Sequence, residues 1–263
     1  MGLIRKTKRF ITKLKGKKAL STNQQHALIE ASKISNKVSA WLENSNYECV
    51  SFGENCNSSW YIKETGNKNA SYPFDWIFSS PEIIIHALKD EFKSFLNKDH
   101  IFPVDKKRAG HVYYHSRMFN HRNPLESDEH YTYYKRAATR LKALLKAQKN
   151  VVFIITVINE PEKRKDWSTG FNKKMALPKN QSANNFKPLI EYIKQINPNS
   201  KFLFINQFTE QKLNINLSFN DDSIMWIDFT SAGANSGVKY SNKIDDTIIK
   251  IVYSGLNDKK NKL

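Results

Sequence analysis

The feature that most constrains this chain is the run Val-Val-Phe-Ile-Ile-Thr-Val-Ile at residues 151–158. All but one of its residues are apolar, and most are β-branched. β-Branched side chains favour strands, and a strand that is apolar on both faces must be covered on both sides. Strands of this kind occur in parallel sheets with helices above and below, so the run predicts an α/β fold.

Segments with helical and strand patterns alternate around this run. We expect helices where apolar residues recur every three or four positions, and strands where short apolar runs end at turn residues. The expected helices cover residues 22–44, 81–96, 126–149, 184–196 and 243–253, and the further strands cover 47–52, 202–205 and 224–227. An aromatic segment at 111–121 is expected to form a hairpin or an irregular arm. This order predicts a three-layer fold. It has a mostly parallel sheet of about four to five strands, helices on both faces, and a helical and aromatic insertion after the first strand.

Length and composition place these elements in one domain. The chain has 263 residues, of which 40% are hydrophobic and 12% aromatic, which is typical of a globular protein with its own core. We therefore assign residues 21–256 to a single α/β catalytic domain. Residues 1–20 form a separate basic segment, and we expect a disordered tail at 257–263.

The basic segment carries eight Lys and Arg side chains within residues 1–18 and no acidic one. Ile4, Ile11 and Leu14 are spaced roughly as on one helix face, so the segment fits either an anionic membrane surface or a solvated tail. No run approaches the roughly 18 apolar residues that span a bilayer, and we expect no secretory signal. We expect a cytoplasmic protein, with the inner membrane face as the alternative location. The net charge of +17 has no RNA- or DNA-binding motif beside it, so nucleic acid is not an expected partner.

The two cysteines, Cys49 and Cys56, stand in different contexts. Two cysteines exclude a disulfide framework and a zinc site made of thiolates alone. Cys49 lies inside an expected strand and fits a small buried core residue. Cys56 follows that strand and precedes Asn57, Ser58 and Ser59, which are typical of helix N-termini. Free N–H groups at such a terminus favour the thiolate and can hold an oxyanion, so Cys56 is the candidate nucleophile.

A thiol nucleophile needs a base, and histidines cluster in the aromatic segment at His111, His115 and His121. His121 and His115 are both candidates for the base, depending on how this segment folds. Three histidines so close together also raise the possibility of zinc, but no pattern of acidic residues accompanies them. We expect no metal and no cofactor for a thiol enzyme of this kind.

Polar residues at strand ends add further candidates, because working residues gather at the carboxyl ends of parallel strands. Asn55 and Asn57 flank Cys56, and Asn159 follows the 151–158 run. Each is a candidate for binding an oxyanion or the substrate. The same rule also selects Glu160, Asn206, Gln207 and Asp228.

Asp75 is the candidate for orienting the catalytic histidine. It lies between two aromatic residues after a proline, where an enclosed carboxylate needs a partner. A turn cap is the plainer role for Asp75, and Asn159 and Asp228 are the alternatives for orienting the histidine. The neighbouring Trp76 is a candidate for substrate contact.

Four motifs are shared with a known family: Ser-Phe-Gly-Glu-Asn-Cys at 51–56, Tyr-Pro-Phe-Asp-Trp-Ile at 72–77, Asp-Glu-Phe-Lys-Ser-Phe-Leu at 90–96 and Phe-Asn-His at 119–121. A basic step from Arg136 to Arg140 then leads to the 151–158 run. In these features the chain resembles, over roughly residues 47–160, a bacterial family of unknown function whose members are described as papain-like cysteine peptidases. The pairing of Pro-Phe-Asp-Trp with Gly-x-x-Cys is more specific than either motif alone.

The resemblance implies a cysteine hydrolase that forms an acyl-enzyme on Cys56, with His121 as base and Asp75 as third member. Its substrate would be a peptide, a glycan or a small molecule. A papain-like α+β fold is the alternative that the family description implies, whereas the strand pattern favours the parallel sheet. Family members often look associated with surface polysaccharide biosynthesis, which implies an alternative thiol acyltransferase with coenzyme A as a cofactor. A third hypothesis is a non-catalytic module that binds a membrane surface through residues 1–18.

Overall fold

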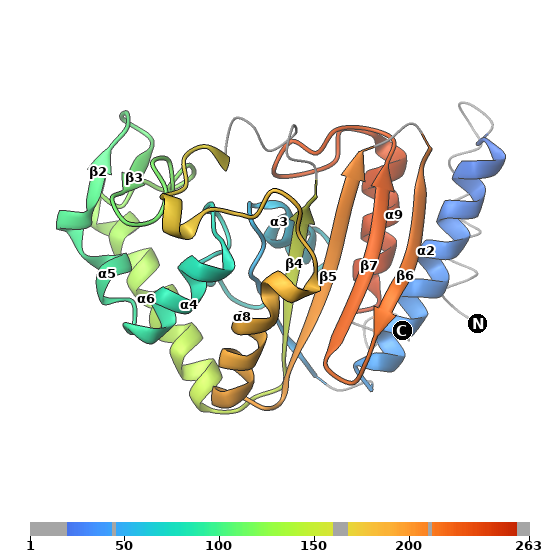
Figure 1. Ribbon diagram of the computed structural model, residues 1–263, viewed down its shortest axis with the longest axis horizontal. Helices are drawn as coiled ribbons and strands as arrows, with labels where there is room; N and C mark the ends of the chain where they lie inside the picture. Colours follow the sequence, from blue (N-terminus) through green and yellow to red (C-terminus); the bar gives the residue numbers. More distant parts are fainter. Residues whose placement is uncertain (1–19, 44–45, 160–167, 210–211, 257–263) are drawn as a thin grey trace.

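The computed structural model describes residues 20–43, 46–159, 168–209 and 212–256. A five-stranded sheet runs through the molecule in the order β1-β4-β5-β7-β6 (Figure 1). Four strands are parallel: β1 (Glu48–Ser51), β4 (Val151–Ile158), β5 (Ser200–Thr209) and β7 (Ile224–Ser231). Strand β6 (Asn214–Asn220) forms one edge and is antiparallel to β7. The predicted mostly parallel α/β sheet is confirmed.

Strand β4 is buried along its whole length and divides the core into two. Successive side chains of a strand point to opposite faces. Val151, Phe153 and Ile155 therefore pack into the core on one face, and Val152 and Ile154 pack into the core on the other. A strand that is apolar on both faces thus produces the three layers that the sequence predicts.

Helices cover both faces of the sheet (Figure 1). One face carries α2 (Thr22–Trp41), α3 (Asn57–Glu64) and α9 (Lys243–Ser254). The other carries α4 (Pro81–Lys89), α6 (Asp128–Lys146) and α8 (Ala183–Ile196). Every helix expected from the sequence is present, with ends shifted by a few residues, except the one over 81–96.

The segment 81–96 forms two helices, α4 and the short α5 (Lys93–Leu96), where the sequence predicts one. Glu91 and Phe92 interrupt it with φ angles of 56° and 66°, in the left-handed region that side chains other than glycine rarely adopt. This turn buries the Phe92 ring completely, against Phe74 and Phe95. Burial of an aromatic ring offsets the backbone strain of the turn.

The insertion after β1 carries the predicted helices and the aromatic arm. A 3-10 turn (η1, Lys98–His100) precedes a small hairpin of β2 (Ile101–Pro103) and β3 (Ala109–His111). The rest of the aromatic segment forms turns, held by an isolated bridge between Ala109 and Phe119 and another between His115 and Phe171. A second 3-10 turn (η2, Lys173–Met175) lies in the connection from β4 to α8.

Three predictions fall on residues outside the described ranges: the basic segment at 1–18, the tail at 257–263, and Glu160. Among the described residues, no helix is both long enough and apolar enough to cross a bilayer.

Candidate active site

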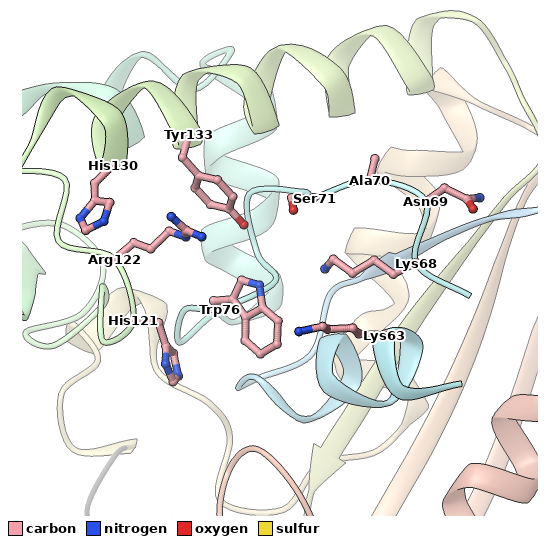
Figure 2. A pocket seen from close by; sticks show the side chains of 10 residues that line it. All are labelled: Lys63, Lys68, Asn69, Ala70, Ser71, Trp76, His121, Arg122, His130 and Tyr133. Atoms are coloured by element: carbon pink, nitrogen blue, oxygen red, sulfur yellow. The ribbon is translucent and has the colours of Figure 1, made fainter. Parts of the chain in front are cut away.

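A pocket of about 790 Å³ opens beside α3 and the first turns of α6 (Figure 2). Its walls come from α3, the loop after α3, the loop before α6, and α6 itself. It is lined by Lys63, Lys68, Asn69, Ala70, Ser71, Trp76, His121, Arg122, His130 and Tyr133. Two residues that the sequence selects, Trp76 and His121, therefore lie on one cavity.

Cys56 stands at the N-cap of α3, directly after the turn that ends β1, as the sequence predicts. The residue is 5% exposed and does not line the pocket. Burial raises the pKa of the Cys56 thiol to about 12; the Asp75 carboxylate adds to the rise, and a hydrogen bond from the Cys56 backbone N–H opposes it. The sequence predicts a lowering of this pKa, and the structure raises it instead. Loss of water around the sulfur outweighs the favourable helix terminus.

Cys56 is expected to react slowly with iodoacetamide in the ligand-free protein. The thiolate is the reacting form, and a pKa of about 12 leaves almost none of it at neutral pH. Alkylation at pH 7 should be at least about a hundredfold slower than that of free cysteine, rising about tenfold per pH unit up to about pH 9. Peptide mapping of the alkylated protein, with Cys56→Ser as the blank, measures the rate. Labelling of Cys56 as fast as free cysteine would contradict a buried, protonated thiol.

Asp75 is buried, and its carboxylate pairs with a lysine rather than a histidine. Its Oδ2 accepts hydrogen bonds from Lys68 Nζ and, at 2.8 Å, from the Tyr72 backbone N–H. Burial raises the pKa of Asp75, and Lys68 counteracts the rise. Among the described residues, no hydrogen bond joins Asp75 to a histidine. No contact between Asp75 and His121 therefore supports the predicted role of Asp75 in orienting that histidine.

His121 lies on the pocket wall with an exposed side chain. Its ring packs edge-on against the Trp76 indole, with the ring centroids 5.8 Å apart. The protein around the ring displaces water from it, and this desolvation lowers the pKa of His121 and favours the neutral imidazole. Within the described part of the chain, no hydrogen bond joins this ring to the Cys56 thiol. Lys68 connects the pocket to the buried Asp75, because its side chain lines the pocket and its Nζ binds the Asp75 carboxylate.

The other two histidines of the aromatic segment are structural. His111 is 2% exposed and stacks on Tyr114 at a centroid distance of 4.1 Å, and burial lowers its pKa to about 4. His115 is 1% exposed and packs against the rings of Phe78 and Phe171. Neither lines the pocket. The described residues contain no group of three or more His, Cys, Asp or Glu side chains placed to hold a metal ion.

Asn55 and Asn57 differ in how their side chains are used. Asn55 is buried, and its Oδ1 accepts the Asn57 backbone N–H at 3.0 Å. Its Nδ2 has no hydrogen-bond partner among the described residues. Asn57 donates to the Val238 carbonyl and accepts from the Thr156 hydroxyl, so both ends of its amide are occupied. Of these two side chains, only Asn55 has an amide nitrogen with no hydrogen-bond partner among the described residues.

The residues selected at the other strand ends have structural partners. Asn159 exchanges two hydrogen bonds with the Gln181 backbone, at 2.7 and 2.9 Å, and so holds the loop before α8. Asn206 and Gln207 lie within β5 and Asp228 within β7, because both strands are longer than expected. Asn206 donates to the Asp228 carboxylate at 2.8 Å. None of these residues lines the pocket.

Sequence reasoning missed the basic residues of the pocket, Lys63, Lys68 and Arg122. The one signal in the sequence is Asp75 itself, because an enclosed carboxylate demands a cation. The sequence does not say which of its 42 Lys and Arg residues supplies that cation.

No curated protein and no solved structure matches this chain. A family model does match it, over residues 47–190, from the strand before Cys56 to the middle of α8. The matched region includes Cys56, Asp75 and every residue that lines the pocket. The chain therefore belongs to the family described as "putative papain-like cysteine peptidase".

Proposed function

We propose that the protein is a cysteine-dependent hydrolase that forms an acyl-enzyme on Cys56. The observation that carries the proposal is the position of Cys56, at the N-terminus of α3 after the first parallel strand. Nucleophiles at strand–turn–helix junctions lie where backbone N–H groups can receive a developing negative charge. The loop after α3 supplies Lys68 and Trp76 to the wall of the cavity that also holds the His121 imidazole.

The proposed reaction begins with transfer of the Cys56 thiol proton to the neutral imidazole of His121. The sulfur forms a bond to the substrate carbonyl carbon, and the resulting imidazolium returns the proton to the leaving amine or alkoxide as its bond to carbon breaks. Water, deprotonated by His121, then attacks the thioester and releases the acid and the thiol. This transfer requires the thiol and the imidazole to come together, because no hydrogen bond joins them among the described residues.

Asn55 is the proposed side-chain donor to the oxyanion. Its buried Nδ2 has no acceptor among the described residues, and an unsatisfied buried donor costs about 1–3 kcal/mol. A negatively charged oxygen beside Cys56 would satisfy this donor at the moment the charge develops. Trp76, on the pocket wall, is the proposed surface for the substrate.

Capture of the acyl group tests this function directly. Incubation with an activated ester such as p-nitrophenyl acetate, followed by acid quenching, is expected to add one acetyl group to the protein. Proteolysis and mass spectrometry should locate the acetyl group on Cys56. If the wild type carries acetyl groups only on lysines, and is acetylated no faster than Cys56→Ser, the proposed nucleophile is contradicted.

The basic lining of the pocket favours a second candidate, transfer of the acyl group from a phosphorylated carrier to a sugar hydroxyl. The first half of the reaction is unchanged, and the hydroxyl replaces water in the second half. Coenzyme A thioesters are the carrier to test. Faster loss of the acyl group from Cys56 when a sugar is added would favour transfer over hydrolysis.

A further inference from the structure

The pocket beside α3 is lined by basic side chains and by no acidic one. Half of its lining residues are basic: Lys63, Lys68, His121, Arg122 and His130. They come from four separate segments of the chain that meet at one cavity. Like charges brought together in a concave site repel one another and create a field that attracts anions.

Two of these cations are held in fixed positions. Lys68 Nζ binds the buried Asp75 carboxylate and donates to Ser59 Oγ at 2.8 Å, and its side chain is only 14% exposed. The Arg122 guanidinium lies 4.5 Å from the centroid of the Tyr133 ring. Such support lowers the conformational entropy that a ligand must remove, so this is a prepared site rather than a patch of mobile surface lysines.

The charged ends converge on one space. Figure 2 shows Lys63 and Lys68 extending toward Trp76 from one side of the pocket, and Arg122 extending from the other, with the Tyr133 hydroxyl between them. An ammonium group has three N–H donors, and Asp75 and Ser59 occupy two of those on Lys68. The third is directed to no hydrogen-bond acceptor within the described ranges.

We propose that this pocket binds a phosphate group carried by the substrate of Cys56. The role as a substrate site rests on the proposed function, because the group must belong to the molecule whose carbonyl carbon Cys56 attacks. Contacts to a phosphate group that is remote from the reacting carbonyl would hold that carbonyl in position for attack.

The balance of charge selects a dianion over a monoanion such as a carboxylate. Lys63, Lys68 and Arg122 carry three fixed positive charges, and Asp75 removes one, which leaves an excess of two. A phosphate monoester carries close to two negative charges at neutral pH and presents three acceptor oxygens. Of the two histidines, His130 already lies 3.2 Å from the Glu126 carboxylate, so only His121 adds charge when it is protonated.

Titration calorimetry at pH 7.5 and constant ionic strength tests the proposal with three probes: glycerol 3-phosphate, inorganic phosphate and acetate. The wild type is expected to bind both phosphates and to bind acetate at least about tenfold more weakly. Lys63→Gln and Arg122→Gln should each weaken glycerol 3-phosphate binding about tenfold or more. Lys37→Gln, an exposed lysine of α2 outside the pocket, removes the same charge and should have no effect.

Three outcomes would overturn the proposal. The first is that the wild type binds neither phosphate, and the second is that Lys37→Gln weakens glycerol 3-phosphate binding as much as the pocket variants do. The third is that the protein binds inorganic phosphate but not the ester. Cys56→Ser is expected to bind glycerol 3-phosphate as the wild type does. Anion binding is therefore measured independently of acyl capture on Cys56, so failure of one proposal is distinguishable from failure of the other.

Discussion

Replacing Cys56 with alanine is expected to lower kcat/KM for ester or amide hydrolysis by at least about a thousandfold, because no acyl-enzyme can form without the sulfur. The fold should survive, since Ala is tolerated at a buried helix N-cap that makes no side-chain capping hydrogen bond. Steady-state hydrolysis of a fluorogenic substrate panel, with thermal melting of each variant, measures both quantities. The same panel would compare candidate substrate classes.

Cys49→Ala is the matched control for this experiment. Cys49 is also buried, also has a pKa raised to about 12, and lies seven residues away inside β1. It packs in the core on the α2 and α9 face, so its loss is expected to cost about 1 kcal/mol of stability and no activity at temperatures where the variant is folded. Equal losses of activity in Cys49→Ala and Cys56→Ala would remove the case for a nucleophile at Cys56.

The fold was predictable because one strong pattern determines it. The continuous apolar run of β4 requires cover on both faces, and the alternation of elements leaves few other arrangements. Strand β6 was missed, although Asn214–Asn220 alternates polar and apolar residues as an edge strand does. Its polar residues resemble a loop, and only the pairing with β7 defines it as a strand. The break at Phe92 was missed because long-range ring packing overrides the local helical pattern.

In the candidate site, too, features set by neighbouring residues could be predicted, and features set by long-range contacts could not. The position of Cys56 between a strand and the start of a helix follows from neighbouring residues and was predicted correctly. Its high pKa depends on burial by segments distant in the sequence, which no local pattern contains. The partner of Asp75 likewise depends on how the loop after α3 folds back, which places Lys68 over Trp76 and beside Asp75.

The Lys68–Asp75 ion pair carries the largest expected effect on stability. Lys68→Met is expected to lower the free energy of unfolding by about 3–5 kcal/mol at pH 7, because it leaves the Asp75 carboxylate buried without a cation. Adding Asp75→Asn should recover much of the loss, since asparagine is uncharged and can still accept the Tyr72 backbone N–H. Urea unfolding measures both effects. Lys187→Met, which breaks an exposed pair with Glu191, is the control and should cost less than about 1 kcal/mol.

The loss in Lys68→Met is also expected to depend on pH in one direction. Burial raises the pKa of Asp75 in the folded protein, and removing Lys68 raises it further. A carboxyl group whose folded-state pKa exceeds its unfolded value favours the folded state when protonated and loses that contribution as pH rises through the folded-state pKa. The difference between Lys68→Met and the wild type should therefore be largest at neutral pH and shrink as the pH falls toward 4. A difference that stays constant over this range would show that Asp75 is not the group left uncompensated.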